Sequence, residues 1–232
     1  MSYGAMKRVA AILLSCALAG GALLAAATAA SGRPGSVCRP GTGRGVLADT
    51  HAQVYVARVF STISKEEERV YLACAYGQRH TYELGDAGMA PATPSGDSGT
   101  VVLALSGDVV AYEQWSVEET QGIGPYVGRD LIFVLDLRTG RVLHKLPTGT
   151  PNPPNPSEVG VGGAGSLVLK PDGAVAWIVD TSEASRHQVH AVDSSGSREL
   201  ASGPGIDSES LALAGSTLYW TDEGEPETAV LH

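Results

Sequence analysis

Two groups of side chains in this sequence have the types and spacing that hydrolysis or metal binding requires. Gly96-Asp97-Ser98-Gly99 presents a serine in the setting of a hydrolytic nucleophile, and His51 lies 47 positions upstream as a candidate base. A catalytic serine needs a base within hydrogen-bond reach and an acid that orients this base. So short an interval leaves no room for the strand that would carry the acid. The sequence therefore favours a linker rich in Ser and Gly at this position.

The second group consists of metal-ligand types. His187 and His190 are three apart in an expected strand, so their side chains point to opposite faces and cannot chelate one ion. The acidic segment 222–227 has enough carboxylates for Ca²⁺ but lacks the regular Asp spacing of a calcium loop. We therefore expect no catalytic residue, no metal site and no cofactor.

Aromatic residues fall into two classes. Tyr112, Trp177 and Trp220 occupy equivalent positions in apolar runs, which predicts core packing. Trp115 and Tyr126, with Arg129 close by, lie in a polar segment that we expect to be a long loop. An aromatic ring beside a cation in a loop is typical of a contact surface, so Trp115, Tyr126 and Arg129 are the candidate binding residues.

The N-terminus resembles an export signal. Lys7 and Arg8 precede an apolar run that ends in small residues with an Ala27-Thr28-Ala29 cleavage pattern, so residues 1–30 are predicted to be a secretory signal peptide. An uncleaved anchor helix and lipidation at Cys16 are the alternatives. Residues 31–232 would then be the mature domain.

Two cysteines, Cys38 and Cys74, are left after this cleavage. In an oxidising compartment such a pair predicts one disulfide that fastens the N-terminal segment to the first sheet, and two free thiols are the alternative. Cleavage would also change the net charge from −9 to −11, because residues 1–30 carry two basic and no acidic residues. A strongly acidic chain argues against nucleic acid as a partner.

The remainder consists of short apolar runs joined by Gly-containing turns. Segment 101–147 holds four such runs, which is the pattern of one up-and-down antiparallel sheet. Weaker copies flank it, and they share a Leu-x-Leu run, a glycine turn and an aromatic residue shortly afterwards: Leu103 to Tyr112, Leu167 to Trp177 and Leu211 to Trp220. The fourth copy ends one strand short. We expect segment 35–40 to supply that strand, with completion by another copy of the chain as the alternative.

Tyr219-Trp220-Thr221-Asp222 resembles the signature of the YWTD propellers, and the repeat pattern is similar to secreted bacterial proteins of the TolB and WD-repeat-like superfamily. The resemblance implies an all-β, β-propeller-like domain of about four diverged four-stranded antiparallel blades, incomplete or closed by the N-terminal segment. It implies no particular ligand, because propellers carry unrelated functions on their loops.

Two functional classes follow from these observations. The first is a secreted, non-catalytic binding or scaffold module that contacts a protein or a glycan through its loops, as a monomer rather than a homodimer. A membrane would be a partner only through an uncleaved N-terminal segment. The second class is a propeller-type hydrolase, either lactonase-like or a glycosidase. The asparagines that a metal-dependent lactonase would need occur only in segment 148–165, which favours the binding module.

Overall fold

The computed structural model describes residues 32–34, 37–41, 43–62, 64–87, 97–118, 127–148, 163–180 and 186–232. At 32–34, 97, 117–118, 127–129 and 180 it describes the backbone alone. The described residues form β-strands and no helix, which confirms the all-β class. Within these ranges no helix has the length and apolarity that crossing a membrane requires. The predicted signal peptide and Tyr126 lie outside the described residues.

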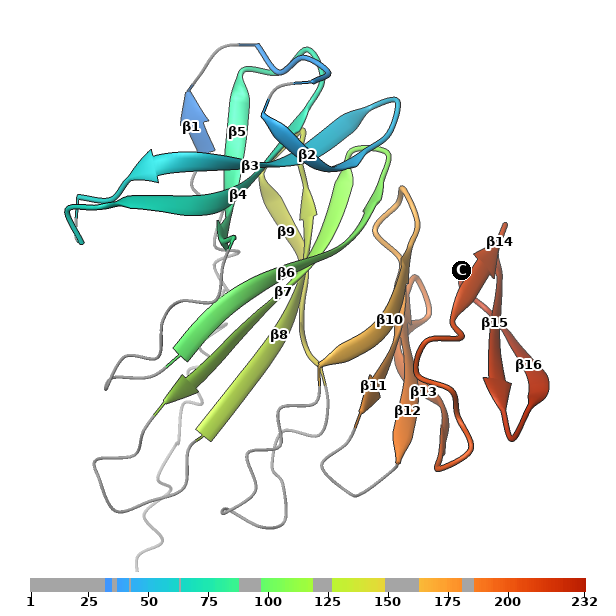
Figure 1. Ribbon diagram of the computed structural model, residues 1–232. Helices are drawn as coiled ribbons and strands as arrows, with labels where there is room; N and C mark the ends of the chain where they lie inside the picture. The colour runs from blue at the N-terminus through green and yellow to red at the C-terminus, as the bar shows by residue number, and fades with distance from the viewer. Residues whose placement is uncertain are drawn as a thin grey trace, which may run out of the picture.

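The strands form four antiparallel sheets that follow one another along the chain (Figure 1). The first has the order β1-β5-β4-β3-β2: β1 (Gly32–Pro34), β2 (Arg44–Ala48), β3 (Ala52–Phe60), β4 (Glu67–Ala75) and β5 (His80–Asp86). The second has the order β6-β7-β8-β9: β6 (Asp97–Ser106), β7 (Val109–Glu118), β8 (Val127–Asp136) and β9 (Arg141–Pro147).

The third and fourth sheets continue this up-and-down order. The third is β10-β11-β12-β13: β10 (Ala164–Leu169), β11 (Val175–Asp180), β12 (His187–Asp193) and β13 (Gly196–Gly203). The fourth is β14-β15-β16: β14 (Ala212–Ala214), β15 (Thr217–Asp222) and β16 (Glu225–Val230). Among the described residues no sheet closes on itself, and the fourth has three strands, as the sequence predicts.

The predicted glycine turns join the first two strands of the second, third and fourth sheets. Gly107, Gly173 and Gly215 all have positive φ, which glycine adopts without strain. In the β8–β9 turn, Asp136 accepts hydrogen bonds from the backbone N–H groups of Arg138 and Thr139 and so satisfies donors that no strand pairs. These local bonds make each hairpin short, so consecutive strands become neighbours.

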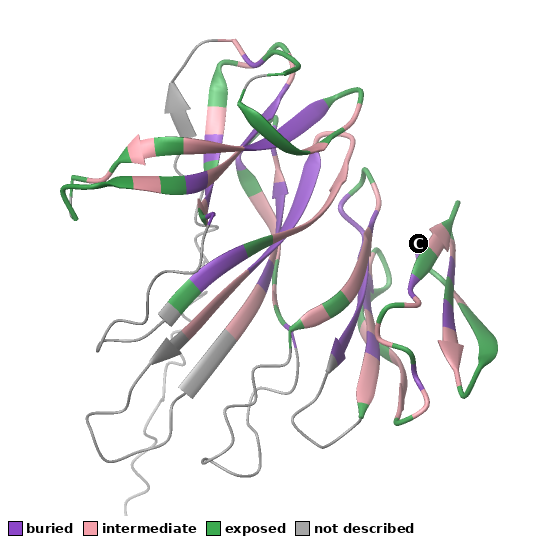
Figure 2. Ribbon diagram, in the orientation of Figure 1, coloured by how far each residue is buried: buried purple, intermediate pink, exposed green. Residues whose placement is uncertain are grey.

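Three apolar cores form where consecutive sheets face each other. Ala52, Leu84 and Val110 belong to the core between the first two sheets, Ile132 and Trp177 to the next one, and the third core contains Trp220 and Ile178. The buried segments of Figure 2 accordingly lie along the middle strands, and β16 is mostly exposed. The predicted core aromatics Tyr112, Trp177 and Trp220 are all buried.

A disulfide links Cys38 to Cys74, as predicted. The segment around Cys38 lies on the face of the first sheet that points away from the second: the backbone N–H of Cys38 donates to the carbonyl of Gln78, and the Gln53 amide donates to the carbonyl of Arg39 at 2.8 Å. β1 in turn pairs with β5. The expectation that segment 35–40 completes the fourth sheet is therefore wrong, because its described part is fixed to the first sheet.

Candidate functional site

The three predicted contact residues do not share the environment that the sequence suggests. Trp115 lies in β7 and Arg129 in β8. The structure describes only the backbone of Arg129, and Tyr126 lies outside the described residues. The expected loop 115–129 is therefore wrong: paired strands extend to Glu118 and resume at Val127. The alternation of polar and apolar residues continues through this segment, so hydrogen bonding to β8 extends the strand beyond its apolar part.

The side chain of Trp115, in β7, packs across β6, the edge strand of the second sheet. Its cross-strand partners are Gly99 in β6 and Asp130 in β8. The indole lies over Gly99, because a Cβ atom built on this glycine would be 2.7 Å from the ring atoms Cε2 and Nε1. Ser98 and Gly99, expected in a linker, thus belong to β6. Of the three tryptophans in the chain, Trp115 is half-buried, while Trp177 and Trp220 are enclosed in cores.

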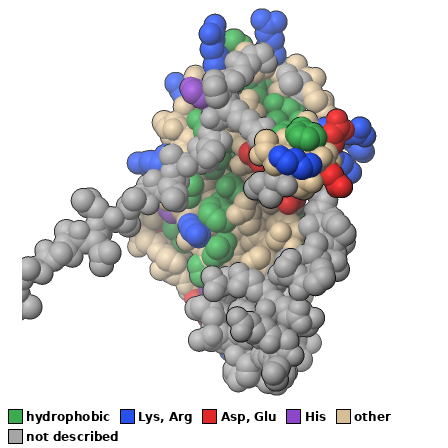
Figure 3. Space-filling view, turned by 90° about the vertical axis from the view of Figure 1, so that its left-hand side faces the viewer, with side chains coloured by type: hydrophobic (Ala, Val, Ile, Leu, Met, Phe, Trp, Pro, Cys, Tyr) green, Lys and Arg blue, Asp and Glu red, His purple; other side chains and the backbone are tan. Residues whose placement is uncertain are grey.

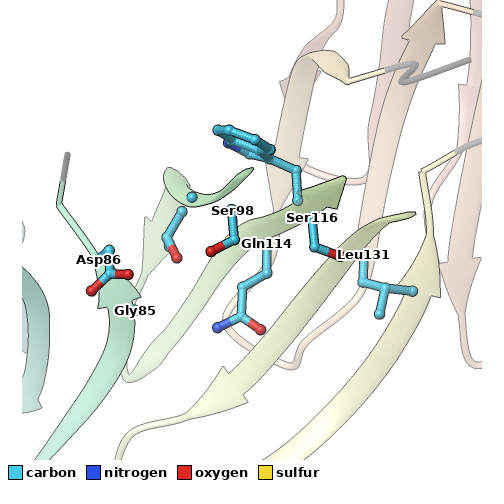
Figure 4. Close-up of a pocket in the computed structure, with 9 residues that line it drawn as sticks. Gly85, Asp86, Ser98, Gln114, Ser116 and Leu131 are labelled. Atoms are coloured by element: carbon cyan, nitrogen blue, oxygen red, sulfur yellow. The ribbon is translucent and has the colours of Figure 1, made fainter. Parts of the chain in front are cut away.

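An open crevice lies between the end of β5 and the face of the second sheet that carries Gln114 and Ser116. The Trp115 ring projects from the other face of β7, because side chains alternate along a strand, so Trp115 borders the crevice without pointing into it. The volume of the crevice is about 370 Å³, near the lower limit of ordinary small-molecule sites. Figure 4 shows Asp86 on the β5 side, across from Ser98, Gln114 and Ser116 of the second sheet. The complete lining is Gly85, Asp86, Ser98, Gly99, Thr100, Gln114, Trp115, Ser116 and Leu131. The side chains that point into the crevice therefore supply hydroxyl, amide and carboxylate groups.

The crevice has one rigid wall. Gln114 donates from its amide nitrogen to the carbonyl of Leu84 at 2.8 Å, which ties the second sheet to the first. Gly85 has φ +134°, and a Cβ atom there would run into the hydroxyl of Thr100. Because neither Gln114 nor Gly85 can be replaced by a larger or differently shaped residue, the distance between β5 and the second sheet is fixed. The polar groups of the crevice therefore occupy defined positions.

The opposite face of the same sheet carries a pair of acidic residues, Glu113 and Asp130, which we call the carboxyl pair. Glu113 is 5% exposed and accepts a hydrogen bond from the backbone N–H of Ala164 at 3.3 Å. Burial, and next the charge of Asp130, raise the pKa of Glu113 to about 7. Burial likewise raises the pKa of Asp130 to about 6, and its Oδ1 is enclosed with no hydrogen-bond partner among the described residues.

The remaining candidates from the sequence do not form sites. His51 borders a separate cavity of about 290 Å³ with Asp108 and Arg138, at the turn end of β6, whereas Ser98 lies at the other end, roughly 25 Å away by strand rise. These two residues therefore form no catalytic pair. His187 and His190 pair with Asp180 and Trp177, which are three apart in β11, so they point to opposite faces as predicted. No group of three potential ligands suited to a metal occurs among the described residues.

Sequence reasoning did not single out Asp86, Gln114 or the carboxyl pair. A usable signal exists only for Glu113, a carboxylate in the apolar run Val109–Trp115 at a position that alternation places beside buried residues. The other side chains become neighbours through sheet packing. Comparison with known proteins gives no further guide, since no protein-family model, curated protein or solved structure matches this chain.

Proposed function

We propose that this protein is a secreted, non-catalytic binding module that holds a polyhydroxylated ligand, a glycan, in the crevice beside Trp115. The supporting observation is the composition of this crevice, which is lined by the hydroxyls of Ser98 and Ser116, the Gln114 amide and the Asp86 carboxylate. Sugars offer many hydroxyls that can donate to and accept from such hydroxyl, amide and carboxylate side chains. A protein partner is the second candidate from the sequence, and the crevice favours the glycan.

Charge narrows the class of glycan. The chain is acidic overall, and Asp86 is a carboxylate in the crevice lining. Negative charge repels uronic and sialic acids, so the proposed ligand is a neutral or an amino sugar. On the face seen in Figure 3, Lys and Arg side chains are spread around the rim and do not gather in one patch. This distribution supports the proposal that nucleic acid is not a partner.

The same proposal includes the architecture and the compartment. First strands of consecutive sheets are neighbours, β2 with β6, β6 with β10 and β10 with β14, which is the order that blades of a propeller-like fold would have. Secretion is supported by the Cys38–Cys74 disulfide, because such bonds persist in oxidising compartments. In this reading the crevice lies between the first two blades of an open, propeller-like series.

The test uses the tryptophan as its own reporter. The full secreted chain is titrated with a panel of neutral and amino-sugar oligosaccharides while emission is recorded, and hits are checked by calorimetry. We expect a shift in emission with at least one glycan, because Trp115 lies in β7 between the crevice residues Gln114 and Ser116, and we expect loss of binding in Asp86→Ala. Tyr219→Ala is the control truncation, because Tyr219 is 41% exposed on the fourth sheet, away from the crevice. Equal binding by Asp86→Ala and the wild type would exclude this site.

A further inference from the structure

The contact between the second and third sheets contains the carboxyl pair at one end. Glu113 and Asp130 lie on adjacent strands: Glu113 faces Ile132, and Asp130 is two residues from Ile132 on the same face. This makes them diagonal neighbours, with about 7 Å between Cβ atoms. Ile132 is fully buried in the core that joins the two sheets. Both carboxyl groups therefore point into a contact between sheets.

The third sheet covers this pair with backbone rather than with charge. Gly163 and Ala164, at the start of β10, lie over Glu113: a Cβ atom on Gly163 would be 3.8 Å from Oε1, and the Ala164 N–H donates to the same oxygen. Farther along the interface, the facing side chains of Trp177 and Val179 are uncharged. Val101, the β6 partner of Glu113, is uncharged too. Asp130 is thus the charged group that acts on Glu113, and it repels rather than neutralises it.

Two carboxylates in such a place cannot both be ionised without cost, because burial and mutual repulsion disfavour the charged forms. The Ala164 N–H favours the ionised form of Glu113, but its effect is smaller than that of burial. Protonating one of the two carboxyls removes the repulsion. Ionising both groups requires that water reach them. The segment that shields Glu113 from water is the start of β10.

We propose that Glu113 and Asp130 form a pH-sensitive latch between the second and third sheets, closed while the pair retains a proton and loosened when both carboxyls are ionised. The 5% exposure of Glu113 makes this role fit better than catalysis, since a substrate does not reach an enclosed carboxyl. The latch does not depend on glycan binding, because the crevice residues Gln114 and Ser116 lie on the other face of the second sheet, whereas Trp115 is on the latch face, opposite Asp130.

The direction of the pH effect follows from the sign of the shifts. A carboxyl whose pKa is higher in the folded than in the unfolded chain contributes its full stability below the unfolded value and loses it as pH rises through the folded value. For Glu113 this interval runs from 4.5 to about 7, and for Asp130 from 3.8 to about 6. The folded chain should thus be favoured, and the latch closed, on acidification from pH 8 to pH 5.

The first experiment measures the two titrations directly. Carboxyl ¹³C resonances of the full chain are followed between pH 3 and pH 9 in the wild type and in Asp130→Asn. We expect Glu113 to titrate near neutrality, and its midpoint to fall when Asp130 loses its charge. A Glu113 midpoint near 4.5 would overturn the latch, and so would a midpoint that Asp130→Asn leaves unchanged.

The second experiment measures the consequence. From pH 8 to pH 5 the unfolding constant of the wild type should fall about 70-fold more than that of Glu113→Gln, by proton linkage at this residue alone. Glu225→Gln, the same change at an exposed position of β16, serves as control and should follow the wild type. Amide exchange at Ala164, corrected for its intrinsic pH dependence, should lose protection above pH 7. Equal pH dependence in the wild type and Glu113→Gln, or unchanged protection of Ala164, would refute the latch.

Discussion

Replacing Gly99 by alanine tests the position of the Trp115 indole, which lies on the face of the second sheet that carries the carboxyl pair. The added Cβ atom would lie 2.7 Å from Cε2 and Nε1 and 2.8 Å from Cζ2 of the ring. Nonbonded carbons rest about 3.5–4.0 Å apart, so the ring must move by about 1 Å. Gly99 does not have the positive φ that would add backbone strain. The change therefore acts through the ring.

The expected magnitude is the balance of two opposing effects. Overpacking of this kind costs about 1–3 kcal/mol. Alanine also restricts the unfolded chain, which stabilises the fold by about 0.4–1 kcal/mol. Gly45→Ala in β2 is the matched control, because no atom lies within 4 Å of its added Cβ and its φ is ordinary. We expect Gly99→Ala to be about 1–3 kcal/mol less stable than Gly45→Ala.

Urea unfolding followed by circular dichroism gives the free energy of both variants, and tryptophan emission reports the environment of the ring. The emission maximum of Trp115 should shift toward longer wavelength in Gly99→Ala, because the ring moves away from the sheet. If both variants were equally stable and their emission spectra matched, the indole would not rest on Gly99. The reasoning that packs Trp115 across Gly99 on one face of the second sheet would then fail.

Three further substitutions test the scaffold that holds these sites. Replacing both Cys38 and Cys74 by serine opens a loop of 36 residues and should lower the free energy of unfolding by about 4 kcal/mol in urea titrations; a loss below about 1 kcal/mol would contradict this. Asp193 accepts two hydrogen bonds of 2.7 Å from Arg198, which lowers the pKa of Asp193. Asp193→Asn should therefore cost about 2–3 kcal/mol at pH 7 and remove the part of the acid destabilisation that begins below about pH 4; equal acid sensitivity in calorimetric scans would be inconsistent with this pair. Gly85→Ala should destabilise by about 2–4 kcal/mol, since it combines positive φ with a collision against β6, and an unchanged melting temperature would speak against the tight contact.

Much of the scaffold could be predicted from local signals. Alternation along the chain predicts the strands, and Lys170-Pro171-Asp172-Gly173 predicts a turn that the structure forms with a backbone bond from Gly173 to Lys170. The even number of cysteines after the predicted signal peptide predicts the bond between Cys38 and Cys74. These features depend on short-range geometry or on a single choice of partner. Sequence alone is therefore sufficient for them.

The candidate site could be predicted only in part. The sequence indicates Trp115 as a contact residue but places it in a loop, because the polar residues around it conceal a strand whose pairing is made by β8. Gln114 and Asp86 carry no signal at all. Their proximity arises when β5 packs on β6 and β7, at positions where Gly85 allows close approach. A pattern along one chain segment cannot reveal which distant segment will lie opposite.

By itself the sequence determined an all-β chain of antiparallel sheets, a short last sheet, a disulfide and an acidic surface. Each of these depends on residue types and on spacings within one hairpin or its turn. Only the tertiary structure decided that segment 37–41 covers the first sheet, that polar groups from two sheets share a crevice and that Glu113 is enclosed beside Asp130. Burial and Coulomb repulsion depend on distance in space, and the packing of one sheet on the next sets that distance.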